Sequence, residues 1–176
     1  MTLVTLLLGT SLYYYQHMQH IAAGKDQQGP VLHPPIGQLR PGFILPDMYG
    51  VLHDINEWDN RVVVINFWAS WCKPCRHEIP LFTRLQSEKG RLGVQFVGIA
   101  IDETSAVNKF IADLDTPVNY PILVGQDAAI TIAKQYGNEF GILPYSVILD
   151  RDGHIVFVQY GEFEEGEIEK ELSHLL

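Results

Sequence analysis

Residues 61–68 form an apolar run that leads directly into a pair of cysteines. The run reads Arg-Val-Val-Val-Ile-Asn-Phe-Trp and is rich in β-branched and aromatic residues, which is typical of a central strand buried on both faces of a sheet. Cys72 and Cys75 follow in the run Trp71-Cys72-Lys73-Pro74-Cys75. Because a strand buried on both faces needs helices above and below it, we expect an α/β fold with the cysteines where this strand passes into a helix.

The rest of the chain from residue 42 alternates between strand and helix patterns, without internal repeats. Asp150-Arg151-Asp152-Gly153 separates two apolar runs and predicts a tight turn between hairpin strands. Acidic residues at 164, 165 and 167 favour a helix start near Phe163, where the helix dipole stabilises negative charge. We expect a mixed sheet flanked by helices, with strands at 43–45, 51–53, 61–68, 94–101, 120–124, 145–149 and 155–160, and helices at 72–90, 104–114, 127–136 and 163–176.

The first 23 residues have a different character from the rest. Residues 1–15 are mostly apolar and carry no charge; this length suits the apolar core of a signal peptide, whereas the tyrosines at 13–15 suit the interface end of a membrane anchor. We therefore predict a signal peptide or membrane anchor at 1–23, a Gly- and Pro-rich linker at 24–35, and one globular domain at 36–176. Either form of the leader places the domain outside the cytoplasm, in the periplasm or anchored to the inner membrane.

Charge and cysteine count exclude several function classes. The chain has 176 residues and a formal net charge of −9, so nucleic acid is not an expected partner, because binding phosphates requires clustered Lys and Arg. Two cysteines are too few for a disulfide scaffold or for a structural zinc site. Of the seven histidines, only His17 with His20, and His77 near Cys75, approach ligand spacing. We expect no metal and no cofactor other than the cysteine pair.

The cysteine pair is suited to reversible redox chemistry. A sulfur at a helix N-terminus is stabilised as a thiolate by unpaired backbone N–H groups and the helix dipole. Cys72 is therefore expected to be the exposed nucleophile, and Cys75, one turn further along, the more buried resolving thiol. Pro74 stiffens the first turn and Lys73 adds a positive charge. An inert structural bridge is the alternative, but so short a loop stabilises a fold little.

Glu78 lies one helical turn after Cys75 and is expected on the same side of the helix. It is a candidate acceptor for the proton of the buried Cys75 thiol. The alternative is a solvated glutamate paired with Arg76 or Arg84.

A second element is the run Gly141-Ile142-Leu143-Pro144-Tyr145. If the Leu143–Pro144 bond is cis, Leu143 would present its backbone to an extended substrate and Pro144 would pack on the active-site sulfurs. Spacing alone leaves the isomer open.

The run from Phe67 to Pro80 resembles the TlpA/ResA-like branch of exported bacterial thioredoxin-like thiol-disulfide oxidoreductases. The resemblance extends over nearly all of residues 36–176 and includes Pro41-Gly42-Phe43, Leu45-Pro46-Asp47, Gly98-Ile99-Ala100-Ile101-Asp102, Pro144 and Asp150-Arg151-Asp152-Gly153. It implies a thioredoxin fold.

The resemblance also implies roles for single residues. Cys72 would be the nucleophile, Cys75 the resolving thiol, Glu78 the acid that tunes the thiols, and Pro144 a cis-proline. Residues expected to contact the substrate are Trp71, Lys73, Pro74, Leu143 and Pro144. Asn66 stands where cytosolic thioredoxins carry a buried Asp, which moves proton handling towards Glu78. The implied partners are client proteins with disulfides, among them apocytochrome c, and a membrane-embedded thiol electron donor.

Three other functions share some of these features. A peroxiredoxin would need a Pro-x-x-x-Ser/Thr-x-x-Cys frame, but Ile65 and Ala69 stand at the corresponding positions. A disulfide-forming oxidase would use the same two sulfurs, and only the reduction potential gives the direction. A non-catalytic module that binds partners or delivers metal is the third alternative. We expect a reductase that acts through Cys72 and Cys75.

Overall fold

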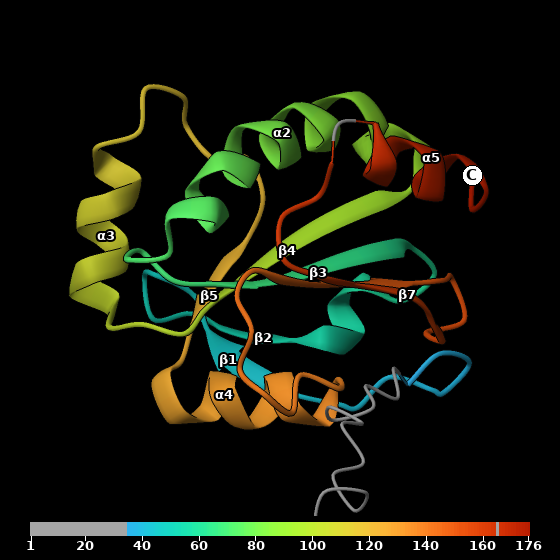
Figure 1. Cartoon of the computed structure of the whole chain (residues 1–176), viewed down its shortest axis with the longest axis horizontal. Helices are drawn as coiled ribbons and strands as arrows, with labels where there is room; N and C mark the ends of the chain where they lie inside the picture. Colours follow the sequence, from blue (N-terminus) through green and yellow to red (C-terminus); the bar gives the residue numbers. More distant parts are fainter. Residues whose placement is uncertain (1–34, 165) are drawn as a thin grey trace, which may run out of the picture. The chain divides into compact units, whose positions relative to one another are not determined.

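The structure is a computed structural model that describes residues 35–164 and 166–176 (Figure 1). The leader predicted at 1–23, and the linker predicted at 24–35 except Pro35, lie outside the described residues. Within the described part, no helix combines the length and apolar character that a membrane crossing requires. The elements are β1 (Ile44–Pro46), β2 (Leu52–Asp54), η1 (Ile55–Trp58), β3 (Val62–Trp68), α2 (Lys73–Lys89), η2 (Gly90–Leu92), β4 (Val94–Ala100), α3 (Thr104–Ala112), β5 (Ile122–Val124), α4 (Gln126–Gln135), β6 (Tyr145–Leu149), β7 (Ile155–Tyr160) and α5 (Glu167–Ser173).

The central sheet has five strands in the order β5-β4-β3-β6-β7. Strand β3 pairs in parallel with β4 and antiparallel with β6, and β6 forms the predicted hairpin with β7. Strands β1 and β2 form a separate antiparallel pair. Figure 1 shows α2 and α5 on one side of the sheet, and α4 with β1 and β2 on the other. The mixed sheet flanked by helices confirms the predicted thioredoxin-like fold.

All seven residues of β3 are buried, as the apolar run predicts. Successive strand residues point to opposite faces, so β3 contributes to both apolar cores. Its even-numbered apolar residues pack with α2, α3 and α5, and its odd-numbered ones pack with β1, η1 and α4. Asn66, an even-numbered polar residue, therefore faces α2. This alternation fixes which side of the sheet carries the cysteine helix.

The C-terminal helix is shorter than predicted. It begins at Glu167 instead of Phe163, because Gly166 before it has a φ of +79°, which is outside the helical range. The Phe163 ring is buried against Phe82 and Phe157. Helix α3 likewise ends at Ala112, two residues before the predicted boundary. Of the acidic residues that indicated an earlier start, Glu167 is the first residue of the helix and Glu164 precedes it.

Candidate active site

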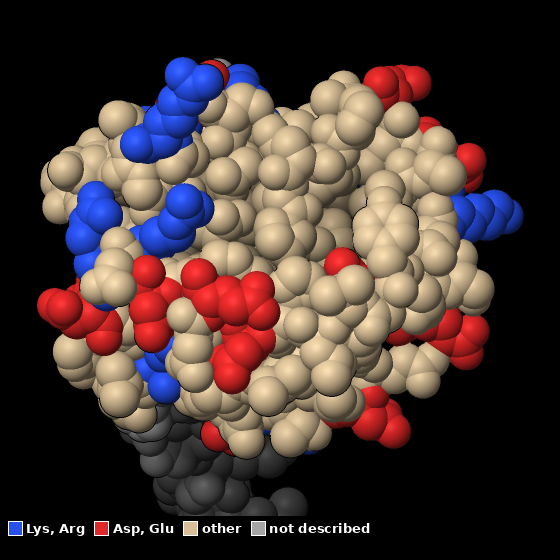
Figure 2. Space-filling model, turned by 180° about the vertical axis from the view of Figure 1, so that it is seen from behind, with Lys and Arg blue, Asp and Glu red and all other residues tan. Residues whose placement is uncertain are grey.

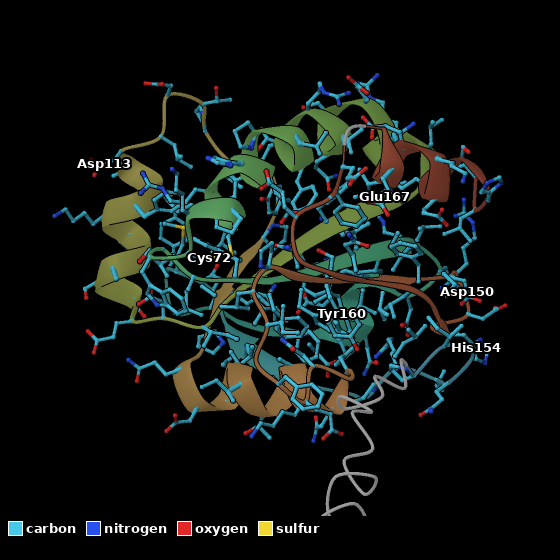
Figure 3. The ribbon with its side chains drawn as sticks, in the orientation of Figure 1. Cys72, Asp113, Asp150, His154, Tyr160 and Glu167 are labelled. Atoms are coloured by element: carbon cyan, nitrogen blue, oxygen red, sulfur yellow. A yellow bond between two sulfur atoms is a disulfide. The ribbon has the colours of Figure 1, made fainter. Side chains whose placement is uncertain are left out.

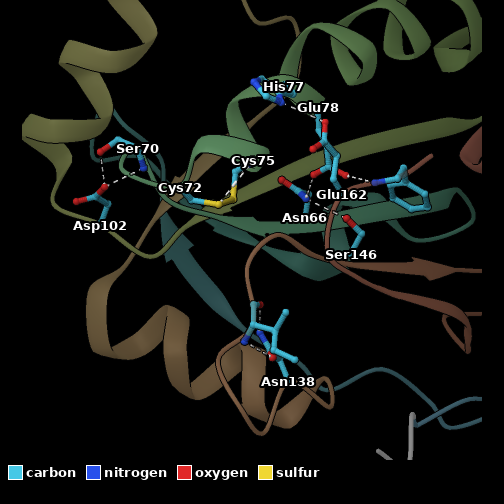
Figure 4. Close-up of a disulfide and its surroundings, with 12 residues drawn as sticks. Asn66, Ser70, Cys72, Cys75, His77, Glu78, Asp102, Asn138, Ser146 and Glu162 are labelled. Atoms are coloured by element: carbon cyan, nitrogen blue, oxygen red, sulfur yellow. Dashed lines mark hydrogen bonds and ion pairs between the residues drawn. A yellow bond between two sulfur atoms is a disulfide. The ribbon is translucent and has the colours of Figure 1, made fainter. Parts of the chain in front are cut away.

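The disulfide lies at the point where the central strand passes into α2. Cys72 is the N-cap residue of α2, and it forms a disulfide with Cys75, with the two Cα atoms 5.4 Å apart. The backbone N–H of Cys75 also donates to Cys72 Sγ, at 3.4 Å. Figures 3 and 4 show the sulfurs at the end of the sheet, beside the first turn of α2. The predicted placement of the first sulfur at a helix N-terminus is thus confirmed.

The two sulfurs differ in exposure, but less than predicted. Cys72 was expected to be exposed, yet only 5% of its surface is accessible, whereas Cys75 is fully buried. In the disulfide, Cys72 packs within the α2-side core with Ala69 and Trp68. Its neighbour Trp71 is 71% exposed. Cys72 is therefore the more accessible cysteine of the pair, as predicted, but a client can reach only a small part of it.

The loop before Cys72 is fixed to the end of β4. Ser70 donates two hydrogen bonds to Asp102 Oδ2, from its hydroxyl at 2.6 Å and from its backbone N–H at 3.0 Å. The N–H of Cys72 donates to the carbonyl of Ala69 at 3.1 Å. Lys73 and Pro74 then form the exposed start of α2. These bonds hold Cys72 in one position relative to the sheet.

Glu78 is buried rather than solvated, with 2% of its surface exposed. It pairs with neither Arg76 nor Arg84. Instead, Oε1 accepts a hydrogen bond from the backbone N–H of Phe163 at 2.9 Å, and Oε2 accepts one from Asn66 Nδ2 at 3.3 Å. Burial raises the pKa of Glu78 to about 7; the nearby Glu162 also raises it, and the two hydrogen bonds oppose the shift. Glu78 can therefore exchange a proton near neutral pH.

Asn66 connects Glu78 to the sheet. Its Nδ2 donates to Ser146 Oγ at 2.9 Å as well as to Glu78, so one amide joins β3, β6 and α2. Figure 4 shows Asn66 between the disulfide and the Glu78 carboxylate in that view. The sequence indicates Asn66 only through the family resemblance, and no pattern in it indicates Ser146 or the Phe163 N–H. A polar residue inside the apolar β3 run was the available signal.

The segment before β6 has the form that the resemblance implies. The Leu143–Pro144 bond is cis, Pro144 is buried and Leu143 is half-buried. Asn138, which no pattern in the sequence indicates, is 1% exposed and holds this segment through two hydrogen bonds. Its Oδ1 accepts from the Ile142 N–H at 3.0 Å, and its Nδ2 donates to the Ile142 carbonyl at 2.8 Å. An asparagine in a loop is too common to have indicated this role.

Among the described residues, no group of three or more His, Cys, Asp and Glu side chains is arranged to hold a metal ion. His77 makes an ion-pair contact with Glu162, with Nδ1 3.4 Å from Oε1. The other candidate histidines, His17 and His20, lie outside the described residues.

Comparison with known proteins agrees with this geometry. The thiol-disulfide oxidoreductase ResA of Bacillus thuringiensis subsp. konkukian is 30% identical over 141 residues, which cover 80% of this chain and 78% of that protein. The thioredoxin-like protein YneN of Bacillus subtilis is 31% identical and covers 78% of each. The crystal structure of a candidate thiol:disulfide interchange protein DsbE from Chlorobium tepidum superimposes with a TM-score of 0.71 at 27% identity, over 80% of this chain and 98% of that one.

These relatives confirm the resemblance to ResA-like thiol-disulfide oxidoreductases. The family called Redoxin matches residues 35–176, which include the cysteine pair, Glu78 and the cis-proline. With its thioredoxin-like sheet and its disulfide at the start of α2, the chain belongs to the redoxin family.

Proposed function

We propose that the protein is a thiol-disulfide oxidoreductase that reduces disulfides of client proteins outside the cytoplasm through Cys72 and Cys75. The observation that carries this proposal is the disulfide at the N-terminus of α2, with Cys72 slightly exposed, Cys75 fully buried and the buried carboxyl group of Glu78 on the same helix.

The reaction transfers two electrons from the protein dithiol to the client. The Cys72 thiolate attacks one sulfur of the client disulfide; the client S–S bond breaks, a mixed disulfide forms and the first client thiolate leaves. Cys75, as a thiolate, then attacks the Cys72 sulfur and displaces the second client thiolate. The products are the client dithiol and the Cys72–Cys75 disulfide. The N–H of Cys75, which points at Cys72 Sγ, stabilises the thiolate that starts the reaction.

Glu78 serves the second step. Cys75 is fully buried, so its thiol loses a proton only if a nearby group accepts it. Glu78 has a pKa of about 7, which suits a group that takes up and releases a proton near neutral pH. We assign Glu78 as the proton acceptor, with Asn66 holding its carboxylate.

Client binding falls to the residues around the disulfide. Exposed Trp71 and the exposed side chains of Lys73 and Pro74 offer contact area beside Cys72. On the facing segment, the backbone of Leu143 pairs with an extended client chain, and Pro144 supports it. The two hydrogen bonds between the Asn138 side chain and the Ile142 backbone keep this segment in place.

The apolar N-terminal sequence supports the proposed location, and the family resemblance supports the proposed electron source. The apolar leader directs export, and if it is retained it anchors the domain to the membrane. A membrane-embedded thiol protein then returns the Cys72–Cys75 disulfide to the dithiol. Apocytochrome c cysteines are one client of this type.

Insulin provides the test of thiol-disulfide exchange. When the dithiol protein is mixed with insulin, we expect two insulin thiols to appear for each Cys72–Cys75 disulfide that forms; free-thiol assays and mass spectrometry of each protein measure this. The control is the same protein after alkylation of both cysteines. Insulin that stays oxidised in the presence of the dithiol protein would remove the enzymatic proposal.

The reduction potential tests the direction. We expect equilibration of the Cys72–Cys75 couple with glutathione to give a reduction potential of about −270 mV, as in thioredoxin, because a reductant must donate electrons to client disulfides. The fraction oxidised is measured after acid quenching and alkylation. A potential near about −120 mV would instead assign the protein as an oxidase.

A further inference from the structure

A basic pocket lies beside the disulfide, between the start of α2 and α3. Its volume is about 510 Å³, and it is lined by Lys73, Arg76, His77, Phe110 and Leu114. Lys73 stands between the two cysteines in the sequence, and Arg76 follows Cys75 directly. The lining thus combines the cationic side chains of Lys73 and Arg76 with the apolar ones of Phe110 and Leu114, and it contains no carboxylate.

The charges of this basic pocket are available to a partner. The Arg76 guanidinium carbon lies 5.0 Å from the centre of the Phe110 ring, a cation–π contact that orients the guanidinium. Within the described part of the chain, Lys73 and Arg76 take part in no ion pair, whereas Arg40 and Arg84 each contact a carboxylate. The Arg76 guanidinium is therefore oriented by the Phe110 ring and is paired with no carboxylate of residues 35–164 and 166–176.

The basic pocket contrasts with the rest of the protein. The chain has a net charge of −9, and Figure 2 shows a face on which Asp and Glu side chains gather into a group. Near the pocket, Glu162 contacts His77, and Asp113 lies past the end of α3, away from Cys72 (Figure 3). This positive charge lies beside the reacting sulfurs of an otherwise acidic protein. It therefore favours the approach of client segments that carry negative charge.

We propose that the basic pocket binds a carboxylate side chain of the client, next to the client's disulfide-bonded cysteine. This inference rests on the proposed function and names its substrate class: clients with Asp or Glu near the reactive cysteine. When a client sulfur reaches Cys72, the residues that flank it in the client come to the basic pocket between α2 and α3. There the carboxylate meets Lys73 and Arg76, and its methylene groups contact Phe110 and Leu114.

Three quenched fluorescent disulfide peptides test the inference. They are identical except that the residues flanking the cysteine are Glu, Gln or Lys. With the dithiol form of the full chain at low salt, we expect the Glu peptide to be reduced about tenfold faster than the Lys peptide, since a few exposed ion pairs give attraction in one case and repulsion in the other. High salt should reduce this ratio, because it screens exposed charges.

Two matched variants locate the effect. Arg76→Gln should lower the Glu-to-Lys rate ratio to about threefold or less, while Arg91→Gln should leave it unchanged. Arg91 is also exposed, but it lies in η2 at the other end of α2. Equal rates for the Glu and Lys peptides, or an Arg76→Gln variant that slows all three peptides by one common factor, would overturn the inference. If the Gln peptide is not reduced at all, the proposed function fails instead.

Discussion

Replacing Cys75 with serine is expected to stop the reaction at the mixed disulfide. Cys72 would still attack the client, because its sulfur and its helix N-terminus are unchanged, but nothing would displace the client from it. The rate at which the dithiol protein releases reduced insulin in a single exchange should fall on the order of a thousandfold, as for other paired catalytic groups that act as a unit. At the same time a covalent complex of the protein with an insulin chain should accumulate, which electrophoresis without reductant and mass spectrometry detect.

The variant Cys72→Ser is the matched control. It removes the other sulfur at the same site and should give neither turnover nor covalent complex, because Cys75 is fully enclosed. Cys75→Ala repeats the trapping experiment without placing a hydroxyl group in an apolar position. A complex that forms with Cys72→Ser and is absent from both Cys75 variants would reverse the assigned roles of the two sulfurs.

Replacing Glu78 with glutamine is expected to change how folding stability depends on pH. In the folded protein the pKa of Glu78 is about 7, against an ordinary value of 4.5. The folded state holds the Glu78 proton more tightly than the unfolded state does. Protonated Glu78 therefore stabilises the folded state fully below pH 4.5, and this stabilisation is lost as the pH rises through 7. The raised pKa corresponds to about 3 kcal/mol lost across this window. Glutamine stays neutral at every pH, so the Glu78→Gln variant does not lose this stabilisation as the pH rises.

The measurement is urea unfolding of the disulfide form at several pH values. The unfolding free energy of Glu78→Gln minus that of the unchanged protein should rise by about 3 kcal/mol from pH 4.5 to pH 8. His53 also has a raised pKa, caused mainly by its hydrogen bond to Glu57. Its contribution to folding stability is therefore also lost as the pH rises above 6.5. Taking the difference removes that contribution, because the substitution leaves His53 in place.

Glu57→Gln is the control, because the pKa of Glu57 is shifted in the opposite direction from that of Glu78. The pKa of the exposed Glu57 is lowered, mainly by His53, so its stabilisation is present above pH 4.5 and is lost only at lower pH. Glu57→Gln also removes the main cause of the raised pKa of His53, so its stability difference should change below pH 4.5 and above pH 6.5 but stay flat between these values, where the difference for Glu78→Gln already rises. In activity, Glu78→Gln should remove the inflection near pH 7 from the rate at which Cys75 resolves the mixed disulfide. A flat stability difference for Glu78→Gln would contradict the assigned burial and proton role.

Local patterns in the sequence determined much of the fold. The apolar run of β3, the hairpin turn at Asp150 to Gly153 and the position of Cys72 at a helix start each depend on a few adjacent residues, so spacing alone predicts them. The start of α5 was predicted wrongly, because acidic residues favour a helix start but do not fix which residue it is. Gly166 and the burial of Phe163 place it at Glu167.

The chemistry of the site depended on contacts between distant segments. Glu78 could have been a solvated helix residue; its burial and its pKa come from Phe163, 85 positions away, and from Asn66 on the central strand. The two hydrogen bonds of the Asn138 side chain and the low exposure of Cys72 also exist only once the segments are packed. The sequence determined which atoms can react, because covalent spacing and helix geometry are local. The tertiary structure alone decided how far those atoms are removed from water, because desolvation sums over every segment packed around them.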